Sequence, residues 1–172
     1  MKKLISNFTI LAIICAIACN QSTKVDEPSK SKASFTQNGP EIDLMKKEME
    51  SYAKGDWVAY RECFDDSALL VVNQWPSDST TKKISLDSAI ANHKKGRETM
   101  WDSMNVNKPI YEVVTDSAGN KYGHIWAKLT PKYKKTHEEV AIILFESVGF
   151  KNNKLAWVWN IYDRTKIVSL MK

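Results

Sequence analysis

The stretch YAKGDWVAYRECFDDSALLV, residues 52–71, contains in order the end of one helix, a short turn, a second helix and the start of a strand. Gly55 ends the first helix, and Asp56 is a typical N-cap for the second because its short carboxylate can accept from free backbone N–H groups. Two aspartates break the second helix, and the apolar run 68–72 has the length and branching of a buried strand. The stretch therefore predicts a helical hairpin followed by a strand.

Upstream of this stretch, Pro40 can occupy the first position of the first helix. Apolar residues then recur at the three- and four-residue spacing of one helix face, namely Ile42, Met45, Met49 and Tyr52. The first helix is therefore expected to begin at Pro40 and end at Gly55.

Downstream, Ser85 is expected to cap a third helix that reaches about Met104. Its buried face follows from the spacing of Leu86, Ala89, Ile90, Met100, Trp101 and Met104. His93 and Arg97 lie on the same line, so helix periodicity predicts that both side chains project inward.

Four strand-like runs complete the chain, at residues 110–116, 121–130, 136–148 and 155–163. The turn-forming segments SAGN, PKYKK and KNNK separate them, which indicates consecutive antiparallel strands. Helices followed by such a meander predict an α+β domain whose sheet wraps over helices.

Alternate residues of a strand share a face, so the last strands can be sorted if their turn centres on Asn152 and Asn153. One face is then aromatic and polar: Tyr122, His124, Trp126, Ile143, Phe145, Asn160 and Tyr162. The other contains Gly123, Ile125, Ala127, Leu129, Ile142, Leu144, Trp157, Trp159 and Ile161. The aromatic face is either the wall of a small-molecule pocket or an outer, wet or dimeric face, and a one-residue slip in register reverses the assignment.

Residues 52–71 and the ending NKLAWVWNIYDR, residues 153–164, resemble the nuclear transport factor 2 (NTF2) superfamily in its SnoaL-like branch, and the resemblance spans residues 41–165. It implies a cone-shaped half-barrel of curved, mainly antiparallel sheet packed on three helices. It also implies an enclosed pocket and, often, a homodimer through the outer sheet face. Enzymes of this superfamily place carboxylates and histidines on the pocket wall, but none of their complete constellations maps onto this chain.

His93 and Arg97 are the first candidates for a site. In one interpretation Arg97 forms a structural ion pair with Glu62, Asp66 or Glu112, since an unpaired buried charge is costly. In the other it holds an anionic group of a ligand while His93 transfers a proton. The expected binding residues are His93, Arg97, Trp101, Trp126, Asn160 and Tyr162. His93 and His124 are the candidate general bases, with Arg97 or Tyr162 steadying negative charge.

Other chemistry lacks support in the sequence. His137, Glu138 and Glu139 have no third ligand at a recognisable spacing, so no metal is expected, and no cofactor is expected either. No serine lies in a nucleophile-elbow motif, and Cys63 is expected to pack as a small hydrophobe. Without residues 1–18 the chain carries 23 basic and 20 acidic side chains, which is no nucleic-acid signature.

The amino terminus resembles a bacterial lipoprotein signal. Lys2 and Lys3 precede an apolar run at 8–18 that ends in Ala-Ile-Ala-Cys, residues 16–19. The resemblance implies cleavage before Cys19 and its acylation, whereas an ordinary secretory signal peptide is the alternative. Asn20 replaces the aspartate associated with inner-membrane retention, which favours the outer membrane of a bacterial cell envelope.

The expected organisation is a signal peptide at 1–18, a lipidated cysteine and flexible tether at 19–39, and a SnoaL-like domain at 40–172. The leading hypothesis is a lipid-anchored protein that binds a small, partly apolar organic molecule. An isomerase, dehydratase or cyclase with a histidine base is one alternative, and a protein-interaction module with a vestigial cavity is another. The expected partners are that ligand, the membrane through Cys19 and a possible second copy at the sheet face, but no nucleic acid.

Overall fold

The computed structural model describes residues 33–170. The expected signal peptide, Cys19 and most of the expected tether lie outside the described residues, and their assignments stay predictions. Within the described residues, no helix has both the length and the apolar character needed to cross a membrane.

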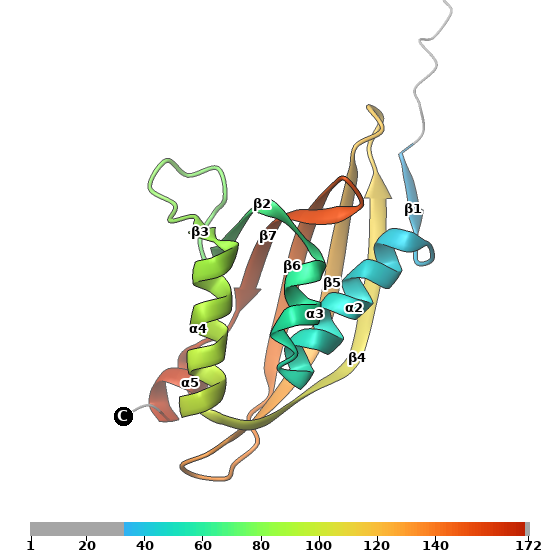
Figure 1. Cartoon of the computed structure of the whole chain (residues 1–172). Helices are drawn as coiled ribbons and strands as arrows, with labels where there is room; N and C mark the ends of the chain where they lie inside the picture. Colours follow the sequence, from blue (N-terminus) through green and yellow to red (C-terminus); the bar gives the residue numbers. More distant parts are fainter. Residues whose placement is uncertain (1–32, 171–172) are drawn as a thin grey trace, which may run out of the picture. The chain divides into compact units, whose positions relative to one another are not determined.

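A seven-stranded sheet in the order β1-β4-β5-β6-β7-β2-β3 forms the body of the domain (Figure 1). Neighbouring strands are antiparallel except for the parallel pair β2 and β7. The strands are β1 Ser34–Thr36, β2 Phe64–Val72, β3 Ile84–Ser85, β4 Trp101–Thr115, β5 Lys121–Tyr133, β6 Ile142–Lys151 and β7 Lys154–Tyr162. The outermost strands β1 and β3 do not pair with each other, so the sheet stays open.

Four helices accompany the sheet: α2 Pro40–Lys54, α3 Trp57–Glu62, α4 Leu86–Thr99 and α5 Thr165–Leu170. The first three lie on one face of the curved sheet, which we call the inner face (Figure 1). The opposite side is the outer face. This α+β arrangement of a curved, unclosed, mainly antiparallel sheet over helices confirms the predicted fold class.

The predicted helical hairpin is confirmed. Pro40 is the first residue of α2, and Gly55 ends that helix in the left-handed region with φ 73°. The Asp56 carboxylate accepts from the backbone N–H of Ala59 at 3.1 Å and so caps α3. The following strand, β2, starts at Phe64, four residues earlier than the apolar run suggested.

The third helix is shorter than predicted. α4 ends at Thr99, and Trp101 and Met104 belong to strand β4 instead of the helix face. The apolar residues Met104 and Val106 are separated by the polar Asn105, which gives the period of two of a strand. Asp102, Ser103 and Asn105 are also poor helix formers. The period of two therefore defines the strand, and Met100 is the C-cap.

The turn at Asn152 and Asn153 is confirmed, and both residues have positive φ, 53° and 58°. A bulge follows immediately, because Phe150 pairs with Leu155 while Gly149 pairs with Trp157. The one extra residue, Ala156, reverses the faces of everything after it in β7.

The predicted grouping of residues by face was therefore wrong in β7. Asn160 and Tyr162 lie on the inner face with Glu146 and Leu144, whereas Trp157, Trp159 and Ile161 lie on the outer face. The grouping within β5 and β6 is correct: His124 and Trp126 share the outer face with Ser147 and Phe145. The aromatic and polar side chains are thus divided between the two faces.

The two ends of the domain also differ from expectation. Ser34–Thr36, expected in the tether, pairs with β4 as an exposed edge strand. Helix α5 was not anticipated, and the Asp163 carboxylate accepts from the backbone N–H of Thr165 at 2.8 Å at its start. The helices and the inner face enclose the core, in which Ile42, Met45, Phe64, Leu70, Ile125, Val148 and Leu155 are almost completely buried.

Candidate functional site

A cavity of about 460 Å³ opens between α4, the ends of β2, β4 and β7, and α5. We call it the main cavity. Its walls combine apolar side chains, including Leu70, Ile84 and Trp101, with the polar groups of His93, Asn160 and Tyr162. Lys82 and Arg164 are exposed residues on its lining.

A much smaller space of about 50 Å³, which we call the inner chamber, lies deeper between α2, α3, α4 and the sheet. Tyr52, His93 and Asn160 line both spaces, so the chamber adjoins the deep end of the main cavity. Its remaining polar lining consists of Glu48, Tyr60 and Glu146.

Two carboxyl groups line the inner chamber. The side chains of Glu48, from α2, and Glu146, from β6, belong to residues that are each only 3% exposed. Glu48 is hydrogen bonded to the Tyr60 hydroxyl, and Glu146 to the Asn160 amide. Of the four buried side-chain oxygens without a partner in the described part of the chain, three belong to residues that line the chamber: Glu48 Oε2, Glu146 Oε1 and Asn160 Oδ1. Such unsatisfied atoms are rare, because each forfeits its hydrogen bonds to water.

Burial raises the pKa of both carboxyl groups. Loss of solvation raises the pKa of Glu146 to about 8. The pKa of Glu48 is also raised well above its usual value, by burial first and by the charge of Glu146 second. Neither carboxyl forms an ion pair with a cationic side chain of residues 33–170. The Glu146 carboxyl is therefore mostly protonated at neutral pH.

His93 projects inward, as helix periodicity predicted. Its ring contacts Tyr52 edge-on at a centroid distance of 5.0 Å, stacks with Trp57 at 6.1 Å, and lies 5.9 Å from Tyr60. Burial among these rings lowers the pKa of His93 to about 4. The imidazole is therefore neutral at neutral pH.

Arg97 does not line either space. Its Nη2 donates to the backbone carbonyl of Ala53 at 3.0 Å, and it forms no ion pair with Glu62, Asp66 or Glu112. The prediction that it projects into the hollow was wrong, because Arg97 instead reaches the backbone carbonyl of Ala53 in the last turn of α2. The structure makes Arg97 a link between two helices.

Of the other predicted site residues, Trp101, Asn160 and Tyr162 line the main cavity, whereas His124 and Trp126 lie on the outer face. His124 Nδ1 lies 3.3 Å from Glu112 Oε1, and Trp126 is 47% exposed. Burial raises the pKa of Tyr162, which is consistent with its place in the wall. The structure thus gathers four of the six expected binding residues around one space.

Sequence reasoning missed Glu48 and Glu146. Glu48 follows Met45 by three residues and so falls on the apolar face of α2, and Glu146 lies in the inward row of β6 between Leu144 and Val148. An acidic residue within each apolar row was the available signal.

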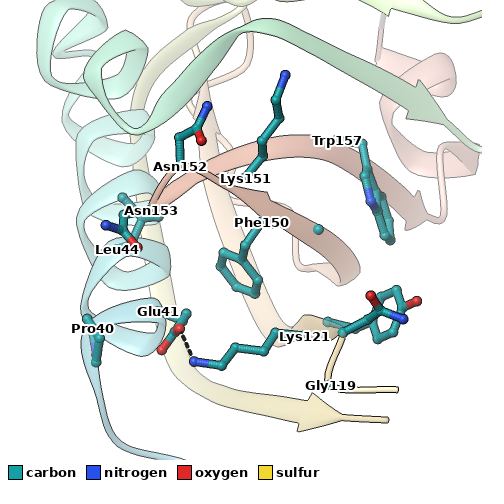
Figure 2. Close-up of a pocket in the computed structure, with 13 residues that line it drawn as sticks. Pro40, Glu41, Leu44, Gly119, Lys121, Phe150, Lys151, Asn152, Asn153 and Trp157 are labelled. Carbon is teal, nitrogen blue, oxygen red and sulfur yellow. Dashed lines mark hydrogen bonds and ion pairs between the residues drawn. The ribbon is translucent and has the colours of Figure 1, made fainter. Parts of the chain in front are cut away.

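A second pocket, of about 530 Å³, lies beside the start of α2 and the β4–β5 and β6–β7 turns (Figure 2). Phe150 and Trp157 point into it, and the Lys121–Glu41 ion pair crosses one side. None of the buried unpartnered oxygens lines this pocket. We therefore take the main cavity and inner chamber as the candidate site.

Metal binding finds no support at the candidate site. Among residues 33–170, no three His, Cys, Asp or Glu side chains are arranged to hold a metal ion. The Cys63 thiol is buried, and burial raises its pKa to about 11, so it is not a reactive thiolate.

No family model matches the sequence, and no curated protein matches it. Solved structures match its fold. PrhC from Penicillium brasilianum is 14% identical with a TM-score of 0.60, covering 79% of this chain and 88% of that protein. An NTF2-like protein of unknown function from Burkholderia pseudomallei is 12% identical with a TM-score of 0.60, over 78% and 99% of the two chains. A putative polyketide cyclase from Xanthomonas campestris is 9% identical with a TM-score of 0.58, over 80% and 100%.

These similarities confirm the fold predicted from residues 52–71 and 153–164. The domain has the NTF2-like fold that the SnoaL-like proteins share. At these low identities the likeness concerns the fold alone, and function has to be argued from the site.

Proposed function

We propose that this NTF2-like domain binds a small, partly apolar organic molecule in the main cavity, with a polar group of that molecule in the inner chamber. The observation that carries the proposal is the set of three buried oxygens without partners, Glu48 Oε2, Glu146 Oε1 and Asn160 Oδ1. A ligand group that reaches them would restore the hydrogen bonds that burial removed.

The dimensions and lining of the main cavity support this proposal. Its volume of about 460 Å³ falls in the range typical of small-molecule sites, roughly 300–1,000 Å³. Leu70, Ile84 and Trp101 supply apolar contact area, while His93, Asn160 and Tyr162 supply orientation. The putative polyketide cyclases among the similar structures are consistent with an organic ligand.

Native mass spectrometry of the protein purified from its own host tests the proposal. We expect a retained organic molecule, and we expect Glu146→Gln to reduce its occupancy. Glu50→Gln, an exposed position on α2, is the matched control. Retention that is equal in all three proteins would contradict binding at the inner chamber.

Proton-transfer catalysis of the isomerase, dehydratase or cyclase type is a second candidate. The favouring observation is Glu146, because a carboxyl with a pKa of about 8 can both accept and donate a proton near neutral pH. His93, the base expected from the sequence, is less suited, since burial lowers its pKa to about 4. Once a ligand is known, turnover that survives in Glu146→Gln would exclude this carboxyl as the acid–base group.

The lipid anchor is a separate part of the proposal. We propose that Cys19 carries lipid and holds the domain at the outer membrane of a bacterial envelope. Labelling of cells with a clickable fatty acid, followed by envelope fractionation, tests it. Cys19→Ala should lose both the label and membrane association, and a label that persists would contradict the assignment.

A homodimer through the outer sheet face is also proposed. Trp126, Ile143 and Ile161 lie on this face and are 47%, 66% and 42% exposed. Exposed apolar side chains gathered on one face are typical of interaction surfaces. Light scattering should give a dimer mass that Ile143→Lys converts to the monomer mass, and a monomer in the unmodified protein would end this proposal.

A further inference from the structure

We propose that the ligand carries a cationic nitrogen, of the primary-ammonium type, which sits in the inner chamber between Glu48 and Glu146 while its apolar body fills the main cavity. This inference rests on the proposed function, since it names the chemical class of the molecule bound at the same site. Three features support it: the lack of a basic partner for the two buried glutamates, the aromatic lining of the inner chamber and the small volume of that chamber.

The first argument is that no basic side chain of residues 33–170 pairs with Glu48 or Glu146. Fully buried glutamates are almost always paired, and here two of them share one chamber without a basic partner in residues 33–170. Arg97, the cation whose charge reaches Tyr52, already donates to the Ala53 carbonyl. A cation supplied by the ligand would complete this arrangement.

The other titratable groups around the chamber supply no positive charge. Tyr52 from α2, Tyr60 from α3 and Tyr162 from β7 all have a raised pKa and are neutral at neutral pH. His93 from α4 is neutral because burial lowers the pKa of its ring. An ammonium group would therefore meet acidic or neutral groups from every neighbouring element.

The aromatic lining is the second argument. Tyr52, Tyr60 and His93 line the chamber beside the two carboxyl groups. Aromatic faces attract cations, most strongly where water is excluded. Two acidic groups, which can lose a proton to a bound cation, and the rings beside them therefore favour a cation over an anion in this small space, and the anionic ligand group expected at Arg97 is not accommodated there.

Size and the cavity mouth are the third argument. A chamber of about 50 Å³ exceeds the roughly 10–15 Å³ needed to hold one water, so it admits an ammonium group, but it is far smaller than the main cavity of about 460 Å³. The apolar body is therefore expected to fill the larger main cavity, whose lining includes the cationic Lys82 and Arg164. The outer end of the ligand is therefore expected to be neutral or anionic.

Calorimetric titration of the full chain with benzylamine, benzyl alcohol and benzoate tests this inference, because the three probes share one ring and differ in the polar group. We expect benzylamine to bind at least about tenfold more tightly than benzyl alcohol, and benzoate to bind least. Benzylamine affinity should rise from about pH 6 to about pH 8, with proton release, because the bound ammonium requires a deprotonated carboxyl.

Glutamate variants test whether the preference for benzylamine arises at the inner chamber. Glu146→Gln should weaken benzylamine by about tenfold or more and change benzyl alcohol by less than about threefold, and Glu50→Gln should change neither. Glu48→Gln serves the same purpose if the first variant unfolds more readily in a thermal scan. Tighter alcohol than amine binding, or amine binding unaffected by either variant, would overturn the inference and leave the binding function standing. Binding of none of the three probes, together with no retained molecule in native mass spectrometry, would remove both.

Discussion

The guanidinium of Arg97 donates from Nη2 to the backbone carbonyl of Ala53 at 3.0 Å, and so ties α4 to the last turn of α2. Carbonyls at a helix C-terminus lack intrahelical partners and carry partial negative charge. Arg97 therefore satisfies an acceptor that the turn at Gly55 leaves free. This link holds α4 over the chamber and explains why a cation lies on the apolar line of that helix.

Replacement of Arg97 by methionine should lower the free energy of unfolding by about 1–3 kcal/mol, because a partly buried hydrogen bond to a charged donor is lost. Urea unfolding followed by circular dichroism measures the change. Lys95→Met, an exposed position on the same helix, is the control and should change stability by less than about 0.5 kcal/mol. Equal effects of the two substitutions would refute the linking role.

The raised pKa of Glu146 predicts a stability that falls with increasing pH. The folded state holds a proton that the unfolded state loses near the usual pKa of 4.5, and releases it only near about 8. Between these values the free energy of unfolding should therefore decrease as pH rises, by up to about 1.4 kcal/mol per pH unit for one group. Urea unfolding at a series of pH values measures this slope.

Glu146→Gln should flatten that slope and become more stable relative to the unmodified protein as pH rises toward about 8. Glu139→Gln, at an exposed position, should keep the original slope. A slope that is unchanged in Glu146→Gln would show that this carboxyl ionises normally in the folded protein.

The local features of the fold could be predicted from the sequence. Gly55 and Asp56 place the turn between two helices by backbone and side-chain preferences that act within a few residues. The Asn152–Asn153 turn was equally readable, because both residues tolerate positive φ. The strand register beyond that turn could not be predicted, because no residue near Ala156 indicates that β7 contains a bulge there.

Packing between distant parts of the chain explains the features that could not be predicted from the sequence. Trp157 lies across Gly149 on the outer face, and the bulge at Ala156 provides this alignment. The candidate site was half predictable for the same reason: His93 followed from helix periodicity, whereas Asn160 reached the cavity only through the bulge. Glu48 and Glu146 come from elements almost a hundred residues apart, so their encounter is a property of the fold.

Gly149→Ala tests the packing of Trp157, because a methyl group at position 149 would overlap the indole ring. We expect a loss of about 1–3 kcal/mol of unfolding free energy, typical of overpacking. The double variant Gly149→Ala with Trp157→Ala should cost clearly less than the sum of the single changes, since removing the indole relieves the overlap. Additive losses in urea unfolding would contradict this contact.

The lowered pKa of His93 predicts acid sensitivity with the opposite sign to that of Glu146. The unfolded state takes up a proton near the usual pKa of 6.5, whereas the folded state takes it up only near about 4. The free energy of unfolding should therefore fall as pH drops between these values, by up to about 1.4 kcal/mol per pH unit.

His93→Gln should lose this component, because glutamine does not titrate. His137→Asn should retain it, since His137 is exposed and asparagine tolerates its positive φ of 57°. Nuclear magnetic resonance titration of the imidazole gives an independent reading, and a ring that protonates near pH 6.5 in the folded protein would show that water reaches His93 freely.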